Sequence, residues 1–440
     1  MPVLPSWRLV AGIAFLVPLS LFGAFSRPVG YLALGLAVVL LLVFAVDVVL
    51  LLVEPIAQLR VLRLASPVLE VGVPTTVSME LTNRGPRRLR VALSDGCPES
   101  LQPSLLPLRT SLAPGERREL SYRVVPRVRG PICFEPTELR VEGRLRMAER
   151  RVRSSIPGEV RVHPDLRHLG GGALRARRSL LQPGGSRRTR SPGRDGDFER
   201  LRDFVAGDDL RHVDWKATAR LQRPITRLYR AEKAQTLMIL VDASRLMASA
   251  TAGRTKMDLA VEAALHLAWT GLSRGDRVGV TVFDDGIRSR VTARAGTAQF
   301  GRILSSLYAQ QPKLRVPRYR KAARDLLLHQ RRRSLVVWIT DLLDVEQGEE
   351  LLAALKALRG RHLSLVVAQD DPGAHRLATA DPSRPSGFFG RAVAAEALSE
   401  REALVSGLCR SGARVVTSGA ERLSAAAVDE YLEVKQSGHL

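Results

Sequence analysis

The chain contains few cysteines, and none of them is spaced for metal binding. Cys97, Cys133 and Cys409 are the only three in 440 residues, and their number is odd. A disulfide-stabilised secreted fold needs more cysteines, and a zinc site needs them in closely spaced pairs. We therefore expect neither feature, and so few cysteines are typical of a reducing compartment.

Aromatic residues and lysine are also scarce. Aromatic side chains make up 5% of the chain, and only seven of its 67 basic residues are lysine, so arginine supplies most of the formal net charge of +23. Such a charge suits nucleic acid, an anionic membrane surface or an acidic partner. Nucleic acid is not expected as a partner, because aromatic side chains for base stacking are few and no known binding module is apparent. The spread of arginine along the chain favours a general compositional bias.

Motifs of common enzymes are missing as well. No histidine lies in an arrangement like that of a catalytic triad, and there is no phosphate loop of the type G-x-x-x-x-G-K-[ST]. The length and the apolar content of 45% are those of a folded protein with several domains.

Long apolar runs occur near the N-terminus, over residues 9–25 and 29–53. At about 1.5 Å per residue each can cross a hydrocarbon core about 30 Å thick, so residues 1–58 are predicted to form a transmembrane hairpin in the lipid bilayer. A signal peptide is the alternative for the first run. Arg60 and Arg63 follow the second run, which predicts a two-pass protein of the cell (inner) membrane with the bulk of the chain in the cytoplasm. Asp47 lies inside the second run and is expected at the headgroup level, with a functional charge pair within the membrane as the alternative.

Residues 59–168 change to a period of two. Val77, Met79 and Leu81 alternate with polar residues, and a turn at residues 83–86 leads into another alternating run. This pattern predicts half-buried antiparallel strands and hence a small β-sandwich. Residues 169–196 are rich in Gly, Ser, Pro and Arg and are predicted to be a flexible basic linker.

The remainder, residues 197–440, alternates between short β-branched runs and longer amphipathic runs. Strands are expected at residues 237–241, 278–283, 335–339, 363–368 and 413–417, with helices at 257–272, 299–307, 351–358, 392–408 and 425–432. This order predicts an α/β doubly wound domain, with a mostly parallel sheet between helices. Ligands bind such sheets beyond the carboxyl ends of the strands, where Asp242 and Asp341 stand.

Two family resemblances cover most of the chain. Residues 196–224, "GDFERLRDFVAGDDLRHVDWKATARLQRP", resemble the signature of the bacterial membrane-protein family called domain of unknown function 58. The C-terminal half is similar to a von Willebrand factor A-type domain, in which a D-x-S-x-S turn, a threonine and a later aspartate build the metal-ion-dependent adhesion site. The signature residues are expected to form either a docking surface or a structural ion-pair network, with Trp215 anchored against the sheet. They include Asp208, Asp209, Arg211, Asp214, Trp215, Lys216 and Arg220.

The turn "LVDASRLMAS" departs from the adhesion-site motif. Asp242, Ser244 and Asp341 can supply oxygen to a metal, but Leu246 stands where the second hydroxyl should be. No Thr or Ser occurs in residues 311–327, where the threonine is expected, and Thr297 is the remaining substitute. Mg²⁺ prefers six oxygens in octahedral geometry, so the incomplete set favours no cofactor over bound Mg²⁺ or Mn²⁺. Arg245 beside Ser244 is a candidate to place a cation where the metal would be.

Two functions from different classes follow. The resemblance implies a membrane-anchored, non-enzymatic interaction protein whose A-type domain docks a partner, a MoxR-type AAA+ ATPase, in protein assembly or maturation. The alternative is a metal-dependent hydrolase that uses Asp242 and Asp341 as ligands. Against this alternative stand the missing oxygen donors and the lack of a general base at a suitable spacing.

Overall fold

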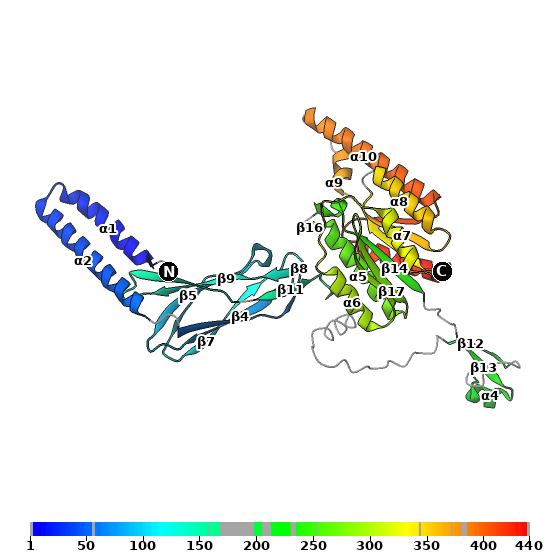
Figure 1. Ribbon diagram of the computed structural model, residues 1–440, viewed down its shortest axis with the longest axis horizontal. Helices are drawn as coiled ribbons and strands as arrows, with labels where there is room; N and C mark the ends of the chain where they lie inside the picture. Colours follow the sequence, from blue (N-terminus) through cyan, green and yellow to red (C-terminus); the bar gives the residue numbers. More distant parts are fainter. Residues whose placement is uncertain are drawn as a thin grey trace. The chain divides into compact units, whose positions relative to one another are not determined.

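The computed structural model describes residues 3–54, 58–156, 158–167, 198–204, 213–229, 235–251, 253–342, 345–370, 372–379 and 385–437. Its contacts divide the chain into two compact units, Met1–Leu166 and Arg167–Leu440. The predicted hairpin and sandwich fall in the first unit, and the signature segment and the α/β region fall in the second (Figure 1). The predicted linker at residues 169–196 lies outside the described residues.

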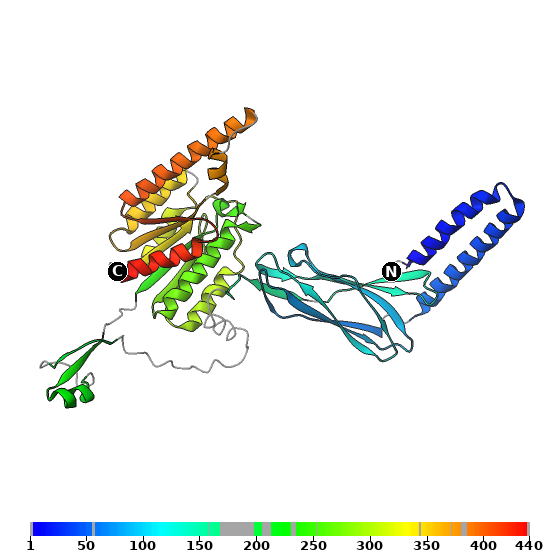
Figure 2. The same ribbon diagram turned by 180° about the vertical axis from the view of Figure 1, so that it is seen from behind.

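Two apolar helices open the first unit and run side by side, α1 (Trp7–Gly23) and α2 (Arg27–Val53) (Figure 2). A proline stands in the first turn of α2, where its missing N–H costs no helical hydrogen bond. By length and composition α2 is able to cross a membrane, whereas α1 is an apolar helix of 17 residues. Their exposed surfaces are covered by large apolar side chains, which is the surface that lipid would solvate.

The rest of the first unit is made of short strands, as the period of two predicts. Val77, Met79 and Leu81 are fully buried in its core, and Ser78 between them is partly exposed, whereas Glu80 is buried and pairs with Arg117. Pairing is antiparallel except between β3 and β11. The strands form three sheets in the following orders: β1 (Val3–Pro5), β10 (Ala148–Ser154), β9 (Glu135–Glu142), β5 (Leu89–Gly96) and β6 (Leu108–Leu112); β2 (Leu59–Leu64), β4 (Thr75–Asn83) and β7 (Arg117–Val124); and β3 (Val68–Glu70), β11 (Glu159–His163) and β8 (Gly130–Cys133).

Asp47 joins α2 to the strands. Its carboxylate is fully buried and accepts the backbone N–H groups of Leu145 (2.8 Å), Met147 (2.8 Å) and Ala148 (3.0 Å) in the turn between β9 and β10. A Cβ on Gly143 would lie 2.4 Å from Asp47 Oδ2, so this turn needs a glycine there. The structure thus gives Asp47 a role that neither sequence interpretation anticipated, because it hydrogen-bonds a strand turn instead of pairing with a charge.

The second unit contains a mixed sheet of six strands. Its order is β18 (Ile287–Arg294), β17 (Arg277–Phe283), β14 (Thr236–Asp242), β19 (Leu335–Thr340), β20 (Leu363–Gln369) and β21 (Arg414–Ser418). All neighbours are parallel except β17 and β18, which form an antiparallel edge pair. Each of the five predicted strand runs forms a strand, and β18 is an addition that the sequence interpretation missed.

Helices lie against both faces of this sheet. Leu237 of β14 faces Gly271 of α5 (Lys256–Ser273), whose neighbours are α6 (Thr297–Leu307) and α11 (Leu423–Gln436). Met238, the next residue, faces the other way and packs with α7 (Tyr319–His329) and α8 (Val345–Leu358). Contacts of α8 extend to α10 (Pro385–Arg410), which also contacts α9 (Pro372–Thr379). The helices α7 and α9 were not anticipated from the sequence.

Candidate functional site: a buried polar cluster at the sheet edge

Polar side chains gather where β14 and β19 end. The two strands are parallel neighbours, with Val241 opposite Ile339, so their last residues, Asp242 and Thr340, lie at the same edge of the sheet. Asp341 follows directly after β19, and Lys256 begins α5 at this edge. The four side chains come from three separate segments, and only the parallel pairing of the strands brings them to one place.

Asp242 is fully buried and takes hydrogen bonds on both carboxylate oxygens. Its Oδ1 accepts the backbone N–H of Ser244 (2.8 Å), and its Oδ2 accepts the hydroxyls of Thr340 (2.6 Å) and Tyr319 (3.3 Å). These two hydroxyls also contact each other at 2.7 Å. Burial raises the pKa of Asp242 to about 6 because it disfavours the charged carboxylate, and the hydrogen bonds lower it only in part.

Asp341 pairs with a buried lysine. The Lys256 ammonium contacts Asp341 Oδ2, and both side chains are almost entirely removed from solvent, at 4% and 0% exposure. Asp341 Oδ1 accepts the backbone N–H of Leu342 (2.8 Å). Lys256 is held in place by a capping box at the start of α5, in which the side chains of Thr255 and Asp258 each accept the other's backbone N–H. A fixed ammonium therefore occupies one face of the Asp341 carboxylate.

The donor set does not fit a divalent cation. Asp341 already has a positive partner, and the Oδ2 of Asp242 is committed to two hydroxyls. The Oγ of Ser244 accepts the Leu246 backbone N–H at 3.3 Å, and Leu246 itself supplies no oxygen. In the described part of the chain, no group of three or more His, Cys, Asp or Glu side chains is placed to hold a metal. The proposed ligands Asp242, Ser244 and Asp341 thus lie together at this edge, but they are engaged by protein donors.

Two sequence interpretations of this site are wrong. Arg245 was the candidate for an internal cation, yet its side chain is exposed and the buried cation is Lys256. Thr297 was the candidate hydroxyl, yet it starts α6 just after β18, whose last residue, Arg294, pairs with Val278 at the beginning of β17. That register places Thr297 near the amino-terminal ends of the parallel strands, whereas Asp242 and Asp341 stand at their carboxyl ends. The hydroxyls at Asp242 come instead from Thr340, one residue before Asp341, and from Tyr319, which lies within residues 311–327, the stretch without Thr or Ser.

A loop over residues 311–318 lies against this edge. Lys313 donates its backbone N–H to the Ala243 carbonyl (2.9 Å), and the Arg315 carbonyl accepts the N–H of Arg245 (2.9 Å). Between these two anchors Leu314 is 89% exposed. The Arg315 guanidinium is paired with Asp285 at 2.8 Å. The outer face of the site is therefore an exposed leucine between basic residues.

The signature segment is described in part. Asp208, Asp209 and Arg211 lie outside the described residues, whereas the later residues fall on α4 (Trp215–Leu221) and its N-cap. This short helix precedes β13 (Ile225–Tyr229), which pairs with β12 (Phe198–Asp203). The Asp214 carboxylate accepts the N–H groups of Lys216 and Ala217, both at 3.0 Å, and so begins the helix.

Trp215 does not anchor against the sheet, contrary to expectation. Its side chain is 69% exposed at the first position of α4, and Lys216 and Arg220 are exposed on the same helix. Because Asp214 already holds the helix start through backbone groups, the indole is not needed for that purpose. An exposed tryptophan followed by basic residues on the same helix is typical of a contact surface.

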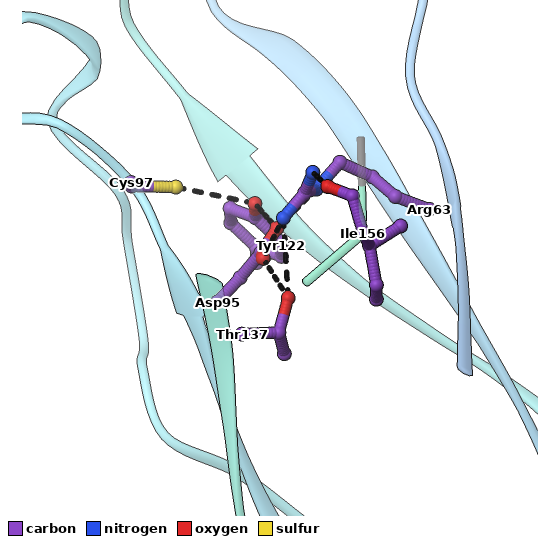
Figure 3. A network of polar contacts seen from close by, with 6 residues as sticks. All are labelled: Arg63, Asp95, Cys97, Tyr122, Thr137 and Ile156. Carbon is purple, nitrogen blue, oxygen red and sulfur yellow. Dashed lines mark hydrogen bonds and ion pairs between the residues drawn. The ribbon is translucent and has the colours of Figure 1, made fainter. Parts of the chain in front are cut away.

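A second buried polar network lies in the first unit, around Asp95 (Figure 3). Its carboxylate pairs with Arg63 and accepts the hydroxyls of Tyr122 (2.6 Å) and Thr137 (2.7 Å). Burial acts to raise the pKa of Asp95, but the hydrogen bonds from Arg63, Tyr122 and Thr137 outweigh it and the pKa is lowered. Burial also raises the pKa of Cys97 to about 11, so this thiol stays protonated. Every group has a partner within the network, and we interpret it as structural.

This network removes one argument about membrane orientation. Arg63 was counted as a flanking positive charge, but its guanidinium is buried and neutralised by Asp95, and it lies 4.2 Å from the ring centre of Phe134. Of the two arginines used for the orientation, only Arg60 remains exposed.

Comparison with known proteins finds similarity over part of this chain. The family described as "Protein of unknown function DUF58" matches residues 200–382, which confirms the resemblance over that span. The span includes the signature residues on α4 and the cluster of Asp242, Lys256 and Asp341.

Individual relatives are similar over the same region. Uncharacterized proteins of Mycobacterium bovis and Mycobacterium tuberculosis are 31% identical over 183 residues, which cover 41% of this chain and 56% of each relative. The chain thus spans about half the length of the curated relatives it matches. Among solved structures, the conserved hypothetical protein BatB from Bacteroides thetaiotaomicron is 15% identical and aligns with 46% of this chain and 99% of its own, with a TM-score of 0.33. A protein of unknown function from Porphyromonas gingivalis is 21% identical over 26% of this chain and 52% of its own, with a TM-score of 0.21.

Proposed function

We propose that this chain is a membrane-anchored, non-enzymatic interaction protein whose second unit docks a partner at the carboxyl edge of its sheet. The observation that carries the proposal is the Lys256–Asp341 pair, because a buried ammonium stands against a carboxylate that a metal enzyme would need free. A reactive site also needs an open place for substrate, whereas here the loop 311–318 bonds to the turn that follows Asp242. With a metal site and an open substrate site both disfavoured, the outer surface of this edge is the part that can bind a partner.

The fold that we propose for this unit is a von Willebrand factor A-like doubly wound domain. In sequence order its strands stand as 3-2-1-4-5-6, which is the order of doubly wound sheets, and helices lie on both faces. The cluster of Asp242, Ser244 and Asp341 then corresponds to a degenerate adhesion site in which Lys256 takes the place of the cation. A basic loop attracts an acidic partner without a metal.

The proposed partner is a MoxR-type AAA+ ATPase, on the basis of the family resemblance, in the assembly or maturation of other proteins. Two exposed features supply contacts for it: Leu314, flanked by Lys313 and Arg315, and Trp215 on α4. Aromatic and apolar anchors with basic neighbours are typical of interface hot spots. The partner surface should accordingly be acidic around an apolar pocket.

Membrane anchoring through α1 and α2 is part of the same proposal. The apolar length of α2 supports it, and the Asp47 contacts bring the strands of the first unit directly to the helix. We propose a two-pass topology in the cell membrane with the remaining chain in the cytoplasm.

Binding of the ATPase to the full chain in neutral detergent tests the docking surface. We expect Leu314→Asp to weaken binding at least tenfold, since it places a carboxylate in the apolar contact and opposes an acidic partner. Leu328→Asp is the matched control, because Leu328 is also an exposed leucine but lies near the end of α7. Equal affinities of the two variants would exclude this surface.

Calorimetric titration with Mg²⁺, Mn²⁺ and Ca²⁺ separates the docking proposal from the hydrolase. We expect no saturable heat from the wild-type chain, because Lys256 neutralises Asp341. Saturable binding that is lost in Asp242→Ala would reverse this conclusion and revive the hydrolase with Asp242 and Asp341 as ligands.

A further inference from the structure

A pocket of about 180 Å³ lies where α2 meets the strands of the first unit. Leu51, Leu89 and Val141 are buried apolar residues of its lining, and Arg88, Arg90 and Arg144 bring three guanidinium groups to it. Two carboxylates, of Glu54 and Glu142, also line it. Arg144 is committed to Glu54, which it contacts at 2.9 Å.

The remaining arginines leave the pocket with a net positive charge. Arg87 adds to the same group by contacting Glu54 at 3.2 Å, so Glu54 is shared between two arginines. Within the described residues, neither Arg88 nor Arg90 forms an ion pair, although Arg90 stands opposite Glu142 in the sheet. Two guanidinium groups are therefore available to bind an anion beside an apolar floor. Their planar N–H donors suit the paired oxygens of a phosphate group.

The pocket stands at the level where the apolar surface of α2 ends. Leu52 and Val53 are exposed apolar residues directly before Glu54, which lines the pocket. Trp7 at the start of α1 is exposed as well, and its neighbour Ser6 donates its N–H to Met147 in the turn that also holds Asp47. Tryptophan at such a boundary is typical of the membrane–water interface. The pocket would thus face the headgroups of the leaflet in which α1 begins and α2 ends.

We propose that this pocket binds the phosphate of an anionic phospholipid headgroup. This inference rests on the proposed membrane anchoring. The phosphodiester is held by Arg88 and Arg90, and the glycerol carbons lie on the apolar floor. Such a lipid would fix the strands against the membrane surface beside the Asp47 contact.

Thermal unfolding of the full chain in neutral detergent tests the site, with a short-chain phosphatidylglycerol, the matching phosphatidylcholine and inorganic phosphate as probes. We expect phosphatidylglycerol to raise the unfolding temperature and phosphatidylcholine to leave it nearly unchanged. Arg88→Gln with Arg90→Gln should weaken the apparent affinity for phosphatidylglycerol by roughly twenty-five-fold, from about fivefold for each arginine near a membrane surface. Arg109→Gln with Arg161→Gln is the matched control, because both arginines are exposed on other strands of this unit.

Each outcome bears on the inference. Equal responses to the two lipids, or an equal loss in the control variant, would overturn the site. An equal response to inorganic phosphate would assign the pocket to a free anion and overturn the proposal that a phospholipid binds there. Alkaline washing of membranes that contain the chain tests the anchoring separately, since release of the wild-type chain would refute the anchoring itself, whereas the lipid selectivity refutes only the site.

Discussion

Replacing Lys256 by methionine should destabilise the second unit by an amount that depends on pH. Methionine keeps most of the side-chain volume but removes the ammonium from Asp341, whose side chain is fully buried. Breaking a buried ion pair by removing one partner costs about 3–5 kcal/mol. A buried carboxyl that takes up a proton escapes this cost, and for an ordinary aspartate with a pKa of about 3.9 that uptake costs about 4 kcal/mol at about pH 7.

The same reasoning predicts a smaller effect in acid. At about pH 5 protonation of an ordinary carboxyl costs only about 1.5 kcal/mol, so the Lys256→Met variant should lose no more than that. The stability of the variant relative to wild type therefore falls as the pH rises. Urea unfolding of the compact fragment Arg167–Leu440, followed by circular dichroism at both pH values, measures the difference.

Two further variants make the test specific. Lys356→Met removes an exposed lysine from α8 and should change the free energy of unfolding by less than about 0.5 kcal/mol. The double variant Lys256→Met with Asp341→Leu removes both charges, and it should recover most of the lost stability. A loss below about 1 kcal/mol at neutral pH, or no recovery in the double variant, would refute the interpretation of Lys256 as the internal replacement for a cation.

Three other changes follow from the described contacts. Asp242→Asn imitates the protonated carboxyl, so between about pH 4 and pH 7 wild type should lose about 2 kcal/mol relative to the variant as the pH passes the raised pKa of about 6; urea unfolding of both proteins at the two pH values checks this. Gly143→Ala should loosen the turn between β9 and β10 and speed its proteolysis in the full chain, whereas Gly35→Ala in α2, with open space around its Cβ, should not. Asp95→Leu should destabilise the first unit by about 3–5 kcal/mol because it leaves a buried guanidinium without its partner, and an unchanged melting curve would show that the network contributes little.

Local pattern was sufficient to locate most secondary structure of the second unit. The five apolar runs between residues 237 and 417 form β14, β17, β19, β20 and β21, because buried parallel strands need continuous β-branched stretches. The strand β18 does not follow this pattern, since it lies at the sheet edge with alternate residues exposed and carries three arginines within "IRSRVTAR". The helix α7 escaped notice for a similar reason, because its basic face hides the apolar spacing of Tyr319, Ala322, Ala323 and Leu326.

The polar cluster was predictable only in its carboxylates. Asp242 and Asp341 each end or follow an apolar run, and the rule that parallel strands present their carboxyl ends together is enough to pair them. Lys256 gave no such signal, because a lysine at the start of a helix is ordinarily a surface residue. Thr340 and Tyr319 do not belong to the motif of a metal site, and only the hydrogen-bonding needs of a buried carboxylate account for them.

The sequence by itself determined the elements whose cause is local: two apolar helices, a region of alternating strands, an α/β alternation and a family signature at residues 196–224. Tertiary structure decided which charges are buried and with what partner. Asp47 bonds a turn about 100 residues away, Arg63 is neutralised by Asp95, and Lys256 reaches Asp341 across 85 positions. Burial makes each of these charges costly unless it is paired or hydrogen-bonded, and such contacts between distant segments are a property of the folded chain that no local pattern encodes.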